Sequence, residues 1–164
     1  MPSSSGSVPA PARQRGTVES IHLHQGRGAP MVPASEASLE SGFGIRGDDK
    51  AGQPTPGSNL TLIAAEAVET MVAETGIPLT PGEARRNVVT RGVDLDALIG
   101  RTFRVGGAVC RGVEPSTPCN HLEAVTRPGV RAGLAGRGGL RADVLEGGVI
   151  RSGDAVEELD DARG

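Results

Sequence analysis

A single cysteine stands where the sequence changes from an apolar segment to a helix-like pattern. Cys119 follows two prolines, Pro115 and Pro118, and precedes a stretch with helical spacing. The backbone N–H groups of a first helical turn are unpaired and carry partial positive charge, which stabilises a thiolate. The alternative is a small buried cysteine, but the polar neighbours Asn120 and His121 are unusual for a core segment. The pattern therefore favours a reactive thiol at Cys119, able to attack an electrophile or bind a metal.

The other groups that could do chemistry have weaker support. Cys110 lies inside an apolar strand pattern, which indicates inert packing. Cys119 and His121 could form half of a zinc site, but structural zinc takes four ligands, and His22 and His24 are far away in the sequence. No Gly-x-Ser-x-Gly segment is present, so a serine hydrolase of that type has no support.

The net charge of −3 conceals a basic centre. Residues 85–141 carry 10 basic and 4 acidic side chains, whereas residues 1–84 carry 5 and 9, and residues 143–164 carry 2 and 7. All but one of the 17 basic residues are arginine, whose rigid fork suits phosphate and carboxylate. This distribution indicates a local site for an anion; the alternative is that the arginines lie on solvated faces.

Composition argues against several classes of function. The lone lysine, Lys50, is not part of a phosphate-binding loop that ends in Gly-Lys-Ser/Thr, and we expect no pyridoxal phosphate in this chain. Phe43 and Phe103 are the only aromatic residues, which weakens nucleic-acid binding because bases need stacking platforms. No apolar run is long enough to span a membrane, and residues 1–14 lack the hydrophobic core of a secretory signal. We therefore expect a cytoplasmic protein with neither a nucleic-acid nor a membrane partner.

Short elements make up the rest of the chain. We predict a helix at residues 64–75, ended by Gly76, and a single helical turn at residues 94–99. Residues 26–52 are rich in Gly, Ser and acidic side chains and are predicted to be irregular. Strands are predicted at residues 16–24, 60–63, 87–90, 102–113 with a turn at Gly106 and Gly107, 141–145 and 149–156.

This arrangement of many short strands and few helices predicts a mainly β protein. A barrel or a closed mixed sheet fits the spacing better than a layer of βαβ units. The length of 164 residues fits one domain. We predict that this domain covers residues 15–160, after a disordered tail rich in Ser, Pro and Ala at residues 1–14 and before a short tail at residues 161–164.

Several segments, taken in order, resemble the MOSC domain family, which is named after the C-terminal domain of molybdenum cofactor sulfurases. The resemblance is to stand-alone members of bacterial type and runs from about Gly16 to about Leu159. It rests on the order and spacing of the segments together, since no single one would suffice. The segments are GIRGDDKA at residues 44–51, ARRNVVTRGVDL at 84–95, IGRTFRVG at 99–106, Pro118-Cys119, RGGLRA at 137–142 and Gly153-Asp154.

The resemblance implies a β-barrel-like fold and a bound molybdenum cofactor of the molybdopterin type. It places the family's functional cysteine on Cys119, which would carry a persulfide sulfur or ligate molybdenum. It also implies that Arg86 and Asn87 hold a cofactor phosphate or pterin edge. The remaining cofactor-binding residues implied by it are Asp48, Lys50 and Arg137. The chain departs from the family in the first segment, where Asp49 and Lys50 follow Gly-Asp and many members have Arg and then His or Lys.

Three functions follow from the resemblance. The first is a cofactor-binding protein that carries or transfers sulfur on Cys119, with a cysteine desulfurase as partner. The second is a molybdenum-dependent oxidoreductase that reduces N-hydroxylated compounds and needs an electron-donor protein. The third is a non-catalytic cofactor-binding module. All three use the same site, and the sequence leaves the choice between them open.

Overall fold

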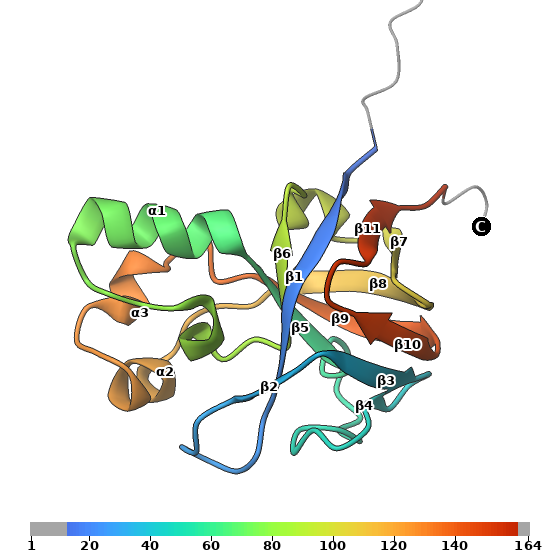
Figure 1. The fold of residues 1–164 in the computed structure, drawn as a ribbon, viewed down its shortest axis with the longest axis horizontal. Helices are drawn as coiled ribbons and strands as arrows, with labels where there is room; N and C mark the ends of the chain where they lie inside the picture. The colour runs from blue at the N-terminus through green and yellow to red at the C-terminus, as the bar shows by residue number, and fades with distance from the viewer. Residues whose placement is uncertain (1–12, 161–164) are drawn as a thin grey trace, which may run out of the picture.

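A closed β-barrel of seven strands forms the body of the protein, as predicted. The computed structural model describes residues 13–160, so the predictions for residues 1–12 and 161–164 lie outside the described residues. Around the barrel, the strands follow the order β1 (Arg15–Leu23), β6 (Val88–Arg91), β5 (Leu60–Ala64), β9 (Leu140–Glu146), β8 (Ala108–Pro115), β7 (Thr102–Val105) and β11 (Ala155–Glu158), which pairs again with β1 (Figure 1).

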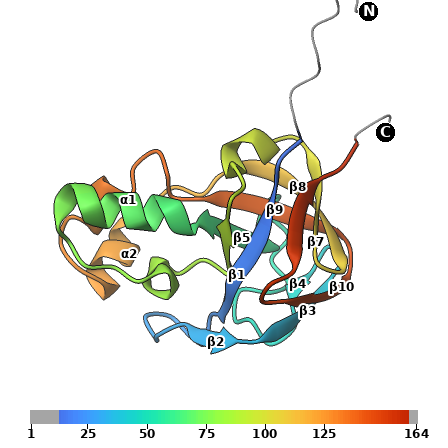
Figure 2. The ribbon, with the colours of Figure 1, turned by 45° about the horizontal axis from the view of Figure 1, so that its top comes forward.

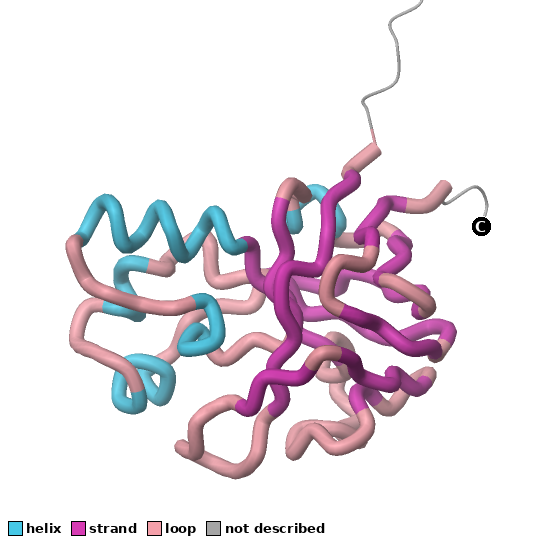
Figure 3. Tube along the Cα trace, in the orientation of Figure 1, coloured by secondary structure: helices cyan, strands magenta, loops and turns pink. Residues whose placement is uncertain are grey.

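The barrel wall is antiparallel except where β5 and β6 run parallel. Their connection contains helix α1 (Ala65–Thr75), which ends at Gly76 in the left-handed conformation, as the sequence predicts. Helices α2 (Asn120–Val125) and α3 (Val130–Gly133) lie with α1 on one side of the barrel (Figure 3). Two 3-10 helices complete the set, η1 (Pro81–Ala84) and η2 (Leu95–Leu98), the second at the predicted helical turn.

Aliphatic side chains fill the barrel, because alternate residues of each strand point inward. Phe103 is fully buried and is the one aromatic side chain of this core. A second cluster packs the helices against the outside of β5 and β6, and it includes Ile63, Met71, Val89 and Leu122. Burial of this aliphatic surface stabilises the fold. None of the described helices has the length and apolar character of a membrane span.

The prediction that residues 26–52 are irregular is wrong. This stretch contains β2 (Val32–Ala34), which pairs with β1, and β3 (Glu36–Glu40) and β4 (Gly44–Ile45). Strands β3 and β4 form a small sheet with β10 (Gly148–Arg151), more than a hundred residues later in the chain (Figure 2). Because these strands are short and depend on that distant partner, local hydrophobic spacing does not reveal them.

The predicted strand at residues 149–156 is two strands. A turn with Gly153 in the left-handed region separates β10 from β11. The backbone N–H of Gly153 donates to the carbonyl of Val18 at 2.7 Å, which directs the chain from the small sheet back into the barrel. The predicted strand, turn and strand at residues 102–113 are present as β7 and β8.

Candidate functional site

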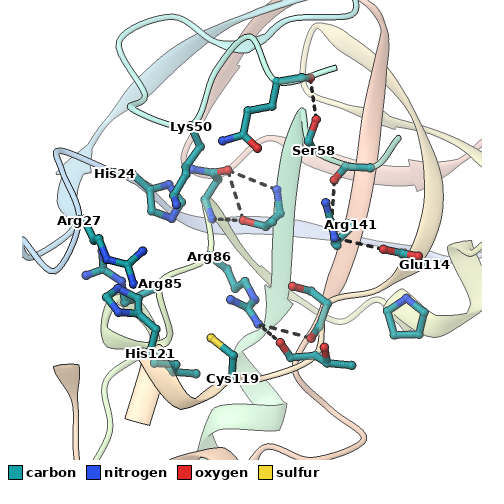
Figure 4. Close-up of a pocket in the computed structure, with 18 residues that line it drawn as sticks. His24, Arg27, Lys50, Ser58, Arg85, Arg86, Glu114, Cys119, His121 and Arg141 are labelled. Atoms are coloured by element: carbon teal, nitrogen blue, oxygen red, sulfur yellow. Dashed lines mark hydrogen bonds and ion pairs between the residues drawn. The ribbon is translucent and has the colours of Figure 1, made fainter. Parts of the chain in front are cut away.

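A pocket of about 330 Å³ opens where the barrel meets α2. Its walls come from the loop between β1 and β2, the loop before β5, the segment between η1 and β6, and the end of β8 with the start of α2 (Figure 4). Five cationic side chains line it, against one carboxylate, that of Glu114. We call it the cationic pocket, and its charged members other than Glu114 are Arg27, Lys50, Arg85, Arg86 and Arg141.

Cys119 lies in this pocket as the residue immediately before α2. It is extended and exposed, and its carbonyl accepts the N–H of Glu123 at 3.3 Å. Cys110, in contrast, is fully buried in β8. Burial, with a smaller contribution from the charge of Asp143, raises the pKa of the Cys110 thiol to about 12. The structure therefore leaves Cys119 as the accessible thiol.

Arg86 extends beside Cys119 into the pocket (Figure 4). Its Nε donates to the carbonyl of Gly138 at 2.9 Å, and one Nη donates to the carbonyls of Ser116 and Thr117 at 3.4 Å. No carboxylate within residues 13–160 pairs with it. Burial lowers the pKa of Arg86 to about 10, with the nearby thiolate of Cys119 opposing this shift and the charge of Arg141 adding to it.

Asn87 and Asp48 form a buried network behind the pocket wall. The side-chain amide of Asn87 donates to Asp48 Oδ2 at 2.8 Å and to the carbonyl of His22 at 3.0 Å, while its oxygen accepts from Thr61. Asp48 also accepts from His24 Nδ1 at 3.0 Å, which fixes the imidazole that lines the pocket. These side chains are used within the protein, so they position the pocket wall.

The carboxyl of Asp48 is held in its charged form by this network. Burial acts to raise its pKa, but the hydrogen bonds from the His24 ring and backbone and from the Lys50 N–H outweigh burial and lower the pKa. The Lys50 N–H donates to Asp48 Oδ1 at 2.8 Å, which fixes the loop that carries Lys50. Lys50, one of the predicted cofactor-binding residues, is exposed and lines the pocket.

Arg27, Arg85 and His121 complete one side of the pocket (Figure 4). Burial first, and then the positive charges of Arg27, Arg85 and Lys50, lower the pKa of His121. On the other side, Arg141 lies 3.1 Å from Glu114 and is neutralised by it. The positive charge of the pocket is therefore concentrated around Cys119, Arg86 and His121.

Of the predicted cofactor-binding residues, Asp48 lies behind the wall of this pocket and Arg137 lies away from it. The Nε of Arg137 donates to the carbonyl of Gly133 at 3.0 Å, and its Nη2 lies 2.6 Å from Glu74 Oε1. It lines a separate depression together with Val93 and Asp96. The guanidinium is thus used to join α1 and α3.

The histidines divide between two cavities. His24 and His121 line the cationic pocket with Cys119, although they are far apart in sequence, whereas His22 lies in a second cavity and contacts the hydroxyl of Ser20 at 2.8 Å. Among the described residues, no group of three or more His, Cys, Asp and Glu side chains is placed to bind a metal ion.

The family follows from the sequence match. The model of the MOSC domain matches residues 48–157 of the chain. The chain belongs to the MOSC domain family. This family is associated with the molybdenum cofactor, and the matched range includes every predicted site residue. No curated protein matches the sequence.

Solved structures share the MOSC fold at low sequence identity. The YuaD protein from Bacillus subtilis matches with a TM-score of 0.76 at 18% identity, over 90% of this chain and 97% of that one. YiiM from Geobacillus stearothermophilus has a TM-score of 0.72 at 18% identity, over 88% and 75% of the two chains. YiiM from Escherichia coli has a TM-score of 0.64 at 20% identity, over 92% and 71%.

Among the pocket residues that sequence reasoning missed are Arg27, His24, Arg85 and Arg141. Arg85 stands next to the predicted Arg86, and Arg141 lies inside a segment that the resemblance already includes, so both had a local signal. Arg27 and His24 had none, because the long loop between β1 and β2 brings them to the site. Only the fold places them opposite Cys119.

Proposed function

We propose that the cationic pocket binds a molybdenum cofactor of the molybdopterin type and that Cys119 is the residue that ligates molybdenum or carries its sulfur. The observation that carries this proposal is Arg86, a largely desolvated guanidinium with no carboxylate partner in residues 13–160, beside an exposed cysteine. An uncompensated buried charge is costly unless an anion completes it. A cofactor phosphate supplies that anion.

The residues present fit such a cofactor. Arg86 offers a fork of donors to a phosphate or pterin edge, and Lys50, on the loop after β4, offers a second positive charge. Cys119 offers a soft thiolate, the ligand type that suits molybdenum chemistry as well as sulfur transfer. Asp48 and Asn87 serve this site as positioning residues, because their polar atoms are occupied by His24, Thr61 and the backbone.

The bound cofactor would supply two-electron redox chemistry, and the chain supplies binding and orientation. In a carrier role, the thiolate of Cys119 attacks the terminal sulfur of a donor persulfide, such as that of a cysteine desulfurase. A persulfide forms on Cys119 as the donor thiolate leaves. Both roles need a solvent-accessible thiol at this position, and Cys119 is exposed.

Cofactor retention tests the proposal. Protein purified from a host that synthesises molybdopterin should contain molybdenum and pterin, measured by mass spectrometry of the metal and fluorescence of the oxidised pterin. Cys119→Ser should lower molybdenum content, and Arg86→Ala should lower pterin affinity by about ten- to hundredfold, as expected for loss of a charge-assisted hydrogen bond. Arg86→Lys should recover part of the loss, because an ammonium keeps charge but not the fork.

Arg104→Ala is the matched control, because Arg104 is exposed on β7 outside the pocket. Thermal unfolding of each variant identifies any loss of fold, since Arg86 also holds the backbone before Cys119. Stoichiometric zinc without pterin, or equal pterin retention by all the arginine variants, would overturn the proposal.

Two further measurements separate the roles of Cys119. A mass gain of one sulfur on the Cys119 peptide, after incubation with a desulfurase and cysteine, assigns the carrier role. Reduction of N-hydroxylated compounds by loaded protein with a reduced electron donor assigns the reductase role. A loaded protein that does neither is a binding module.

A further inference from the structure

Three cations of the pocket remain without a counter-charge. Arg27, Lys50 and Arg85 come from three separate segments, namely the loop between β1 and β2, the loop after β4, and the end of η1. No carboxylate within residues 13–160 forms an ion pair with any of them. We call these three side chains the outer cluster, to distinguish them from Arg86 beside Cys119.

The outer cluster converges on one place. Arg27, Lys50 and Arg85 all line the same pocket as His121. Figure 4 shows Arg27, Arg85 and His121 together on one side of the pocket, Arg86 directly above Cys119, and Arg141 on the far side. The three positive charges repel one another, and a bound anion would turn this repulsion into attraction.

Hydrogen bonds fix the Arg85 side chain and the backbone at Lys50. Arg85 is the only described residue other than glycine in the left-handed region, with φ of 63°, where it ends η1. Its Nη1 donates to the carbonyl of Ala29 at 2.6 Å, which fastens it to the loop that carries Arg27. Asp48 accepts the backbone N–H of Lys50, which fastens the third member. Left-handed backbone at a non-glycine residue costs energy, and the bonds of Arg85 to the Gly82 and Ala29 carbonyls offset that cost.

A single phosphate does not balance this pocket. A phosphate monoester carries about −1.5 to −2 charges near neutral pH. Glu114 already neutralises Arg141, and one phosphate beside Arg86 leaves most of the charge of the outer cluster uncompensated. The guanidinium forks of Arg27 and Arg85 suit the several acceptor oxygens of a phosphoryl group better than one carboxylate.

We infer that the outer cluster of Arg27, Lys50 and Arg85 is a second anion subsite of the pocket and that it binds a diphosphate-type group. The inference deepens the proposed function, because it gives the ligand a second anionic part. The diphosphate of a dinucleotide form of the cofactor and the phosphates of a phosphorylated substrate share this chemistry. The subsite itself is testable without any cofactor.

Inorganic pyrophosphate is the probe. Apo protein from a host without the molybdopterin pathway, checked for fold by circular dichroism, is titrated by calorimetry at about 0.15 M salt, where long-range screening is strong. Pyrophosphate should bind at least about tenfold more tightly than phosphate, because it engages more of the cations at once. The double variant Arg27→Gln and Lys50→Gln should lose about tenfold or more of the pyrophosphate affinity.

Arg104→Gln is the control and should bind pyrophosphate as the parent does, since Arg104 is exposed outside the pocket. Pyrophosphate and phosphate that bind alike, or equal binding by the double variant and Arg104→Gln, overturn the inference.

These outcomes separate the inference from the proposed function. Pyrophosphate binding that depends on the outer cluster, in a chain that never retains molybdenum, supports the subsite and removes the cofactor. Retained molybdenum without pyrophosphate binding does the opposite. In loaded protein, release of a nucleotide from the extracted pterin assigns the subsite to a dinucleotide cofactor. A pterin without a nucleotide, in loaded protein that still binds pyrophosphate, assigns it to a phosphorylated substrate.

Discussion

Arginines of the outer surface and cations of the pocket have different surroundings. On the surface, Arg91 contacts Glu19 and Glu69, and Arg151 Nε lies 3.2 Å from Glu36 Oε1. In the pocket, Arg86 contacts only backbone carbonyls in the part of the chain that the structure describes. The charge of a paired guanidinium is balanced by a carboxylate of the protein. The charge of an unpaired and desolvated guanidinium is balanced only when an anionic ligand binds.

The two thiols repeat this difference between barrel and pocket. Cys110 packs inside the barrel wall, where burial suppresses ionisation of its thiol. Cys119 is exposed immediately before α2 and lines the pocket with the cationic side chains. The barrel residues therefore contribute to stability, whereas the pocket residues remain available to react with or bind a ligand. The predictions below test that difference, starting with the largest effect.

The largest expected difference is in thiol reactivity. With its pKa near 12, Cys110 has a thiolate fraction of about 10⁻⁵ at neutral pH, and its side chain is inaccessible. Cys119 should therefore react with iodoacetamide at least about a thousandfold faster, measured by timed alkylation and peptide mass mapping. Cys119→Ser should abolish the fast phase and Cys110→Ala should leave it. Comparable modification of both peptides in folded protein would contradict the difference.

Much of the barrel was predictable because its strands and α1 follow local rules. The alternation in β1, the helical spacing after Leu62 and the glycine turn between β7 and β8 each favour one structure. Strands β2 to β4 were missed because their stability comes from pairing with β1 and β10, and pairing across such separations leaves no local pattern.

The pocket was predictable in part, because several of its residues lie in segments that carry the family resemblance. The resemblance selected Cys119, Arg86, Asn87 and Lys50, and the fold brings them together. It also selected Arg137, whose local segment matches but whose side chain turns to Glu74. The direction of a long side chain depends on its neighbours in space, so a segment match does not determine it.

The next largest expected effect is on stability, at the buried network behind the pocket. Asp48→Ala leaves donors of His24, Asn87 and Lys50 without their acceptor, so it should lower the free energy of unfolding by about 2–4 kcal/mol at neutral pH. Urea denaturation measures this. The exposed neighbour provides the control, and Asp49→Ala should change the stability little.

The pH dependence of that effect has a definite sign. The folded pKa of Asp48 is lowered from its ordinary value of 3.8, so its contribution to stability is complete above that value. The contribution is lost as the pH falls through the folded pKa. The difference in stability between the parent and Asp48→Ala should therefore be constant near neutrality and shrink below about pH 4. A difference that grew on acidification would contradict the charged network.

The smallest expected effect is at a paired arginine on the surface. Arg151 and Glu36 are both more than half exposed, so solvent screens their attraction and ordering two side chains offsets much of it. Arg151→Ala should change the free energy of unfolding by about 0.5 kcal/mol or less, and the change should shrink further in about 1 M salt. Cofactor retention and pyrophosphate affinity should stay at the level of the parent. If Arg151→Ala lost cofactor to the extent expected for Arg86→Ala, the positive charge that binds the cofactor would not be confined to the pocket.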